Sequence, residues 1–143
     1  LGTTPRTQGG AMTLAAAEVA DFVDAKYVCV FTESGDSARR MSRLRFKIPM
    51  KAFTVEESIR RRMALIWGIE SFVVDRVTHT DAMYFQVDSV LLENGLAERG
   101  DKVVVISGSP PGVPGSTNDV RVHVIGTAID GAAPVWESGE HAD

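Results

Sequence analysis

The sequence predicts a three-layer α/β domain, in which helices cover both faces of a mostly parallel sheet. Short apolar runs of strand length alternate along the chain with segments of helical periodicity. Four of these runs are apolar throughout, which is typical of strands buried on both faces. The last run, 120–125, alternates apolar and polar residues, so we expect it at an edge of the sheet. Helices and strands in this order favour right-handed crossovers around one core.

The totals of the composition limit the classes of protein that fit. The chain has 143 residues, enough for one domain with a sizeable core. A net charge of −4 argues against a nucleic-acid partner. No apolar stretch approaches the roughly 20 residues of a membrane span, and we find no signal-peptide pattern, so we expect no membrane partner. The single cysteine, Cys29, cannot form an internal disulfide, and we expect it to pack in the core of a cytoplasmic protein.

The first part of the chain reads as a leader, a helix and a strand. Residues 1–9 are small and polar and are predicted to form a linker or leader. The chain starts at Leu1 without a Met, which favours a domain cut from a longer protein. A helix is predicted over 11–23, followed by a buried strand over 27–31. The apolar stripe of the helix comprises Met12, Ala15, Ala16, Val19, Phe22 and Val23.

The turn after this first strand, 32–37, has the composition of a phosphate-binding site. Gly35 allows a tight turn and a close approach to a ligand. Thr32, Ser34 and Ser37 offer hydroxyl groups, and the first amides of a helix predicted over 37–44 would face the same place. The same residues fit equally well a capped helix without a ligand, in which Ser34 or Ser37 is the N-cap.

The middle of the chain continues with a basic segment, a strand and a helix. Arginines and lysines between 39 and 47 could steer anions to the turn, although a solvated helix face is the simpler interpretation. A short strand is predicted over 48–53. The next helix is predicted over 55–67, with Thr54 and Glu57 as a capping box and Gly68 at its end. Its inward stripe comprises Ile59, Met63 and Ile66.

The rest of the fold follows the same alternation. A third strand is predicted over 71–74, and a helix that begins at Thr78 or Thr80 is predicted to end near Asn94. The run 102–107 is the most strongly β-forming stretch of the chain. Residues 127–143 have no periodicity, and we expect them to form a mobile tail.

A second candidate loop, 108–118, is rich in glycine, serine and proline. It can present amides to an anion, but it lacks the lysine of a Walker A loop and the helix that follows a dinucleotide fingerprint. Alone, it is better interpreted as a crossover loop stiffened by prolines. Ligands of parallel sheets bind beyond the carboxyl ends of the strands, so this loop and the turn 32–37 are predicted to converge on one site.

No catalytic or metal site is predicted. His79, His123 and His141 are far apart and lack the spacing of metal ligands. No serine–histidine–aspartate set and no pair of carboxylates can be inferred from spacing alone. The residues by themselves therefore indicate a phosphate-binding module without evident chemistry.

The order of several motifs resembles the C-terminal domain of pyruvate kinases, most closely the bacterial members. Asp24-Ala25-Lys26 and the stretch 31–39 match a "DAK…TxSGxSAR" pattern, and segments 64–69, 80–83, 102–118 and 121–123 continue it in the family's order. The resemblance covers roughly residues 10 to 126 and implies a five-stranded sheet whose last strand is antiparallel at an edge. We therefore expect residues 10–126 to form one effector-binding domain.

The resemblance also implies a function. Pyruvate kinase is a transferase of glycolysis that moves phosphate from phosphoenolpyruvate to ADP with Mg²⁺ and K⁺, and this chemistry belongs to a barrel domain. The C-terminal domain carries an allosteric effector site and part of the tetramer interface, with no cofactor of its own, so we expect this chain to be inactive alone. A free-standing sensor of phosphorylated ligands with this fold, or a small enzyme that reuses the phosphate-binding turn, are the alternatives.

The resemblance also implies which residues form the effector site, when the family's motifs are matched to this sequence. The phosphate pocket matches Thr32, Ser34, Gly35, Asp36 and Ser37. The loop that closes over the effector matches Gly112, Gly115, Ser116 and Thr117. Glu33 takes a position that is often Lys or Gln in members activated by fructose 1,6-bisphosphate. Repulsion between a carboxylate and two neighbouring phosphates weakens binding by on the order of 1 kcal/mol or more for each phosphate. In addition, residues 108–110 lack the Trp-Arg pair of family members that bind the bisphosphate. We expect a monophosphate effector, such as AMP or a sugar phosphate, or none.

Overall fold

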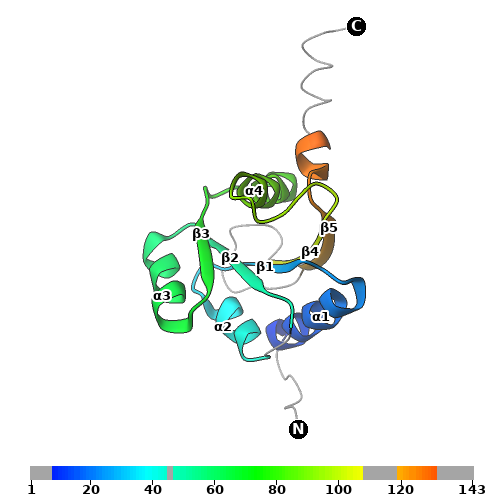
Figure 1. The fold of residues 1–143 in the computed structure, drawn as a ribbon. Coiled ribbons are helices and arrows are strands. Elements are labelled where there is room, and N and C mark those ends of the chain that lie inside the picture. Colours follow the sequence, from blue (N-terminus) through cyan, green and yellow to red (C-terminus); the bar gives the residue numbers. More distant parts are fainter. Residues whose placement is uncertain (1–7, 45–46, 108–118, 132–143) are drawn as a thin grey trace, which may run out of the picture.

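A sheet of five strands forms the middle layer of the fold (Figure 1). The computed structural model of the chain describes residues 8–44, 47–107 and 119–131. In chain order the strands are β1 (Tyr27–Phe31), β2 (Met50–Thr54), β3 (Glu70–Val73), β4 (Lys102–Ser107) and β5 (Asp119–Val124). The helices are α1 (Gln8–Val23), α2 (Asp36–Ser42), α3 (Glu57–Trp67) and α4 (Thr80–Glu93).

The strand order across the sheet is β3-β2-β1-β4-β5. β1 lies in the middle and pairs in parallel with β2 and with β4, so that Val28 is opposite both Met50 and Val104. β2 and β3 are also parallel. β5 runs antiparallel to β4 and forms one edge. The predicted fold class, with its antiparallel last strand at an edge, is confirmed.

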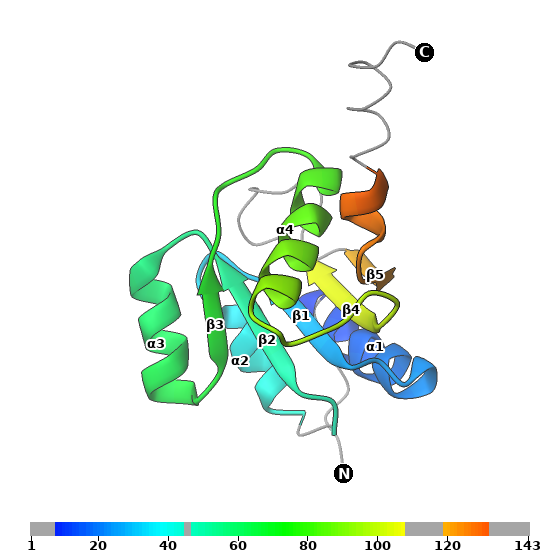
Figure 2. The same ribbon diagram turned by 45° about the horizontal axis from the view of Figure 1, so that its top comes forward.

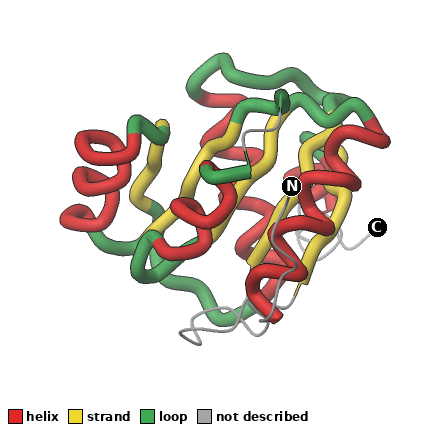
Figure 3. Tube along the Cα trace, turned by 90° about the horizontal axis from the view of Figure 1, so that it is seen from below, coloured by secondary structure: helices red, strands yellow, loops and turns green. Residues whose placement is uncertain are grey.

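Three helices cover one face of the sheet. α1, α2 and α3 pack against side chains that alternate along the parallel strands, including Val28, Val30 and Ile106. Figure 3 views this layer from below, with the helices in front of the strands. Small residues let α1 approach the sheet closely, because Ala16 and Ala20 are both fully buried.

The other face is covered by α4 (Figure 2). Met83, Val87 and Leu91 of this helix are buried against Cys29, Phe53 and other residues of the strands. Cys29 has 0% of its surface exposed, which confirms its predicted packing role, and burial raises the pKa of its thiol. None of the helices in the described ranges is long and apolar enough to cross a membrane.

Two large side chains that the periodicity placed on inward stripes point outward. Phe22 of α1 is 89% exposed and Ile66 of α3 is 68% exposed. On α1 the buried face is built from small residues, among them Thr13, Ala16 and Ala20, rather than from the largest ones. On α3 the fully buried side chain is Met63. The predicted stripes were therefore wrong at Phe22 and Ile66, and also at Ala15, which is exposed.

The predicted capping box of α3 is also wrong, whereas its end is confirmed. Thr54 is the last residue of β2, and the N-cap of α3 is Glu56, which makes no side-chain capping bond. The Thr54 hydroxyl accepts a hydrogen bond from the Glu56 N–H at 3.3 Å instead. Gly68 ends the helix in the left-handed conformation, with φ 66°.

The chain after β5 turns back onto the sheet. Residues 127–131, the start of the predicted tail, form a short turn of helix beside α4 (Figures 1 and 2). Ala128 packs with the residues under α4. The remainder of the predicted tail, 132–143, lies outside the described residues, as does most of the predicted leader.

Candidate functional site

The turn 32–37 lies at the carboxyl end of the central strand. The Thr32 N–H donates to the Phe53 carbonyl at 2.9 Å, which holds the start of the turn against β2. The chain proceeds from β1 outward to β2 and β3, and then returns to β4 on the other side of β1. Such a change of direction leaves a crevice beyond the strand ends, where ligands of open α/β sheets bind.

β1 and β4 end side by side at this edge of the sheet. Val30 is opposite Ile106, and each lies one residue before the end of its strand. The chain therefore leaves both strands at the same edge of the sheet. The second predicted loop starts directly after Ser107, but its site residues Gly112, Gly115, Ser116 and Thr117 lie outside the described residues.

Side-chain hydroxyls occupy the backbone donors of the turn. The Gly35 N–H donates to Thr32 Oγ1 at 2.8 Å, and the Asp36 N–H donates to Ser34 Oγ at 3.2 Å. The N-cap of α2 is Gly35, with no side-chain capping bond of its own, and Ser37 is buried. Thr32, Ser34 and Gly35 thus form the turn, Asp36 and Ser37 begin α2, and two hydroxyls and two amides are already paired.

Gly35 is required at its position for two separate reasons. Its φ of 90° belongs to the left-handed region, which side chains rarely adopt. A Cβ atom there would also lie 2.9 Å from Cζ3 of Trp67. Trp67 of α3 therefore packs directly against the turn at Gly35. The centre of its ring also lies 6.0 Å from the guanidinium carbon of Arg39.

Glu33 does not stand as a free negative charge. Arg76, in the connection between β3 and α4, donates from Nη1 to Glu33 Oε2 at 3.1 Å and from Nη2 to Oε1 at 3.2 Å. Both side chains are partly exposed. The pair joins the turn to the connection before α4, a contact across 43 residues that the sequence did not indicate.

The basic segment that follows the turn is mostly solvated. Arg39, Arg40 and Arg43 are exposed, in agreement with the simpler interpretation of this run. Arg39 also lies 3.7 Å from an Asp36 carboxylate oxygen. Within the described ranges no cluster of three or more His, Cys, Asp or Glu side chains could hold a metal ion.

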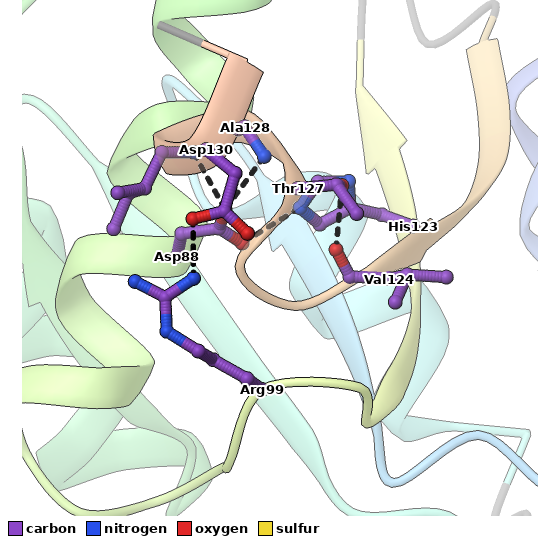
Figure 4. Close-up of polar contacts among 8 residues, drawn as sticks. Asp88, Arg99, His123, Val124, Thr127, Ala128 and Asp130 are labelled. Carbon is purple, nitrogen blue, oxygen red and sulfur yellow. Dashed lines mark hydrogen bonds and ion pairs between the residues drawn. The ribbon is translucent and has the colours of Figure 1, made fainter. Parts of the chain in front are cut away.

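A buried polar cluster under α4 was missed by the sequence analysis (Figure 4). Asp88 is fully buried, and its Oδ1 lies 2.7 Å from Nε2 of His123 on β5. Its Oδ2 accepts hydrogen bonds from the N–H groups of Ala128 and Ile129 at 2.9 and 3.2 Å. The one signal in the sequence was a carboxylate on the apolar face of α4, next to Val87 and Leu91.

A groove of about 1110 Å³ runs along α4. Its lining includes Val73, Asp75, Val77, Phe85, Arg121 and Thr127. Asp75 and Val77 flank Arg76, so one end of the groove lies next to the Glu33–Arg76 pair. Tyr84 also lines the groove. The guanidinium carbon of Arg121 stacks over its ring, 4.6 Å from the ring centre.

Comparisons with known proteins place these features in a family. The family model described as "Pyruvate kinase, alpha/beta domain" matches residues 10–123. A pyruvate kinase of Mycobacterium tuberculosis is 45% identical over 122 residues, and one of Corynebacterium efficiens is 40% identical over 122 residues. Each match covers 85% of this chain and 26% of the relative, so the chain spans about a quarter of the length of these curated relatives.

A solved structure gives the same likeness in three dimensions. A pyruvate kinase from Cryptosporidium parvum superimposes with a TM-score of 0.75 at 23% sequence identity. The match covers 86% of this chain and 24% of that one. At this identity the likeness shows the fold alone.

Proposed function

Because this chain belongs to the pyruvate kinase alpha/beta domain family, we propose that it forms the regulatory domain of a pyruvate kinase and binds a phosphorylated effector. The observation that carries the proposal is the turn 32–37 at the carboxyl end of β1. Two hydroxyls and two backbone N–H groups converge there, at the point where strand order reverses.

In the proposed complex, the phosphate takes over the hydrogen bonds of the free turn. Its oxygens accept from the N–H groups of Gly35 and Asp36, which the hydroxyls of Thr32 and Ser34 occupy in the free chain. The displaced hydroxyls then donate to the phosphate, so no group loses a partner. Ser37 lines the base of the turn. The second loop completes the site with Gly112, Gly115, Ser116 and Thr117.

In the same proposal, the phosphate-transfer reaction is carried out by a part of the enzyme that this chain does not contain. The complete enzyme would transfer phosphate from phosphoenolpyruvate to ADP with Mg²⁺ and K⁺ in glycolysis. This chain spans 26% of the length of its relatives, and we assign none of its residues a catalytic role. We therefore expect no turnover from the chain alone when pyruvate formation is coupled to lactate dehydrogenase.

Calorimetric titration tests the effector site and its preference. We expect glucose 6-phosphate or AMP to bind more tightly than fructose 1,6-bisphosphate, because the carboxylate of Glu33 would repel a second phosphate at the turn. Thr32→Val removes the hydroxyl with little change of shape and should abolish binding, whereas Thr127→Val, far from the turn, should leave it unchanged. Tight binding of the bisphosphate alone, or an undiminished affinity of Thr32→Val, would contradict the assignment.

We also propose that β5 contributes to self-association, as the tetramer interface of the family would require. β5 has β4 as its one strand partner in the described residues, and its other edge is open. Val122 and Val124 on this strand are 40% and 36% exposed. An open edge with exposed valines is suited to pairing with the same edge of a second copy.

A further inference from the structure

On the basis of the proposed function, we infer that Arg76 determines which anions the turn accepts. Glu33 holds Arg76 in an ion pair in the free chain, and a phosphate-bearing ligand takes Arg76 over when it binds. The preference of the site is then a property of the Glu33–Arg76 pair rather than of the carboxylate alone.

The geometry places Arg76 within reach of the turn. Its two terminal nitrogens donate to the two carboxylate oxygens of Glu33 at 3.1 and 3.2 Å, which is a bidentate arrangement. Glu33 lies between Thr32 and Ser34, the residues whose hydroxyls face the turn amides. The guanidinium is therefore held beside the turn by the carboxylate of one of the turn's own residues.

The pair is able to open. The Arg76 side chain is 50% exposed and the Glu33 side chain 33% exposed, so both are reached by solvent and by a ligand. Ion pairs at such positions stabilise a fold only weakly, because water screens them. Opening the pair to admit a ligand should therefore not disturb the sheet or the helices.

A phosphate is a stronger partner for Arg76 than the carboxylate. It carries a charge of about −1.5 to −2 at neutral pH and offers three acceptor oxygens. The planar guanidinium matches both groups in a bidentate manner, so the exchange needs no large movement. The released carboxylate of Glu33 stays beside the bound phosphate and repels a second one, which restricts the turn to ligands with a single phosphate.

A simpler explanation makes a different prediction. If Glu33 acted only as a negative charge, its removal would strengthen the binding of a given anion by a similar factor whether or not Arg76 is present. If Glu33 acts by holding Arg76, the benefit of removing it depends on Arg76. A double-mutant cycle separates the two explanations, because it measures this dependence directly.

The experiment is a calorimetric titration of the complete chain with glucose 6-phosphate. The proteins are the unmodified chain, Glu33→Gln, Arg76→Gln and the double variant. Glu33→Gln should lower the dissociation constant by about tenfold and Arg76→Gln should raise it by at least about tenfold. In the Arg76→Gln background only the direct repulsion by Glu33 remains, so Glu33→Gln should lower the constant by a clearly smaller factor, about threefold or less.

Two further variants act as controls. Glu57→Gln breaks a similar exposed pair, Glu57–Arg60 on α3, and should leave the dissociation constant unchanged. Arg76→Lys keeps the charge but not the planar fork, so its affinity should lie between those of the unmodified chain and Arg76→Gln. It also provides a second substitution if Arg76→Gln does not fold.

The outcomes separate this inference from the proposed function. An equal gain from Glu33→Gln in both backgrounds would overturn the role of Arg76 and leave the phosphate site standing. Binding by Glu33→Gln but not by the unmodified chain would support the inference, because the pair then closes the turn. Absence of binding in all the proteins would overturn both.

Discussion

At the scale of single residues, Asp88 illustrates how a charged group is kept inside the core. It is fully buried on the inner face of α4, and its two carboxylate oxygens lie within hydrogen-bond distance of three nitrogen atoms, from His123, Ala128 and Ile129. A buried carboxylate is tolerated when its lone pairs are satisfied in this way. Asp88 therefore fastens β5 and the turn 127–131 to α4.

Removal of the Asp88 carboxylate should be strongly destabilising. Asp88→Ala leaves the buried donors without an acceptor and should lower the free energy of unfolding by about 3–5 kcal/mol. Asp88→Asn keeps one acceptor oxygen, and we expect a loss of about 1–2 kcal/mol. Urea denaturation measures both. Asp81→Asn, on an exposed position of the same helix, should change little, and equal effects at the two positions would contradict this role of Asp88.

Tyr84 gives a prediction at high pH. Burial raises its pKa to about 12, Arg121 opposes this shift, and Asp119 adds to it. The folded phenol keeps its proton at a pH where the unfolded one, with an ordinary value of 10.0, has lost it. The resulting stability is fully present below pH 10 and is lost as the pH rises toward 12.

Tyr84→Phe tests this shift. The Tyr84 hydroxyl is buried without a hydrogen-bond partner among the described residues. At pH 7 its removal breaks no hydrogen bond and relieves a buried, unpaired polar group, so the free energy of unfolding should stay unchanged or rise by up to about 1–3 kcal/mol. Between pH 10 and 12 the variant should lose less stability than the unmodified chain in thermal unfolding. Parallel losses in the two proteins would show that the phenol does not titrate as described.

Contacts between residues that are far apart in the chain could not be predicted from the sequence. Asp88 and His123 are 35 positions apart, and Glu33 and Arg76 are 43 positions apart. Each pair is brought together by strand order and register, which local periodicity does not encode. The residues of the turn 32–37, by contrast, were predicted together because they are adjacent in the chain.

At the scale of elements, most of the fold was predictable because strands and helices have different periods. The strands 27–31 and 102–107 were predicted with the bounds that the structure has. The errors are in the cap of α3, in the start of the predicted tail and in which face of a helix is buried. Leu65 and Ile66 of α3 are 83% and 68% exposed, because α3 packs on β2 and β3 near the edge of the sheet. Helical periodicity identifies a stripe, but only packing decides where it faces.

The contact between the turn 32–37 and α3 gives a prediction at this scale. Gly35→Ala places a side chain in the left-handed region and within 2.9 Å of Trp67. Gly95→Ala is the matched control, since Gly95 has φ 66° and open space around it. The control should lose about 1–2 kcal/mol of stability, and Gly35→Ala about 1–3 kcal/mol more from the contact with Trp67. Equal losses in urea denaturation would contradict the contact.

At the scale of the whole molecule, the topology decides where a ligand site can form. The motif order alone indicated the pyruvate kinase family, and the family model confirms it over residues 10–123. The place of the turn follows from the strand order, because β1 lies between β2 and β4.

Self-association through β5 is a prediction for the whole molecule. Sedimentation equilibrium should show association that increases with concentration, and Val122→Lys should weaken it, because a charge at the open edge opposes pairing. Val73→Lys is the matched control, since Val73 is 44% exposed on the opposite edge strand. A strict monomer at high concentration, or equal effects of both variants, would contradict an interface at β5.

The central claim is that the turn 32–37 binds a phosphate group, and an NMR titration of the complete chain with glucose 6-phosphate tests it most directly. The account predicts saturable shifts of the Gly35 and Asp36 amide signals, together with the Nε–H signal of Arg76. The amides of Glu57 and Asp81 should not move. Saturable shifts confined to other parts of the chain, or no shifts at saturating ligand, would contradict the claim.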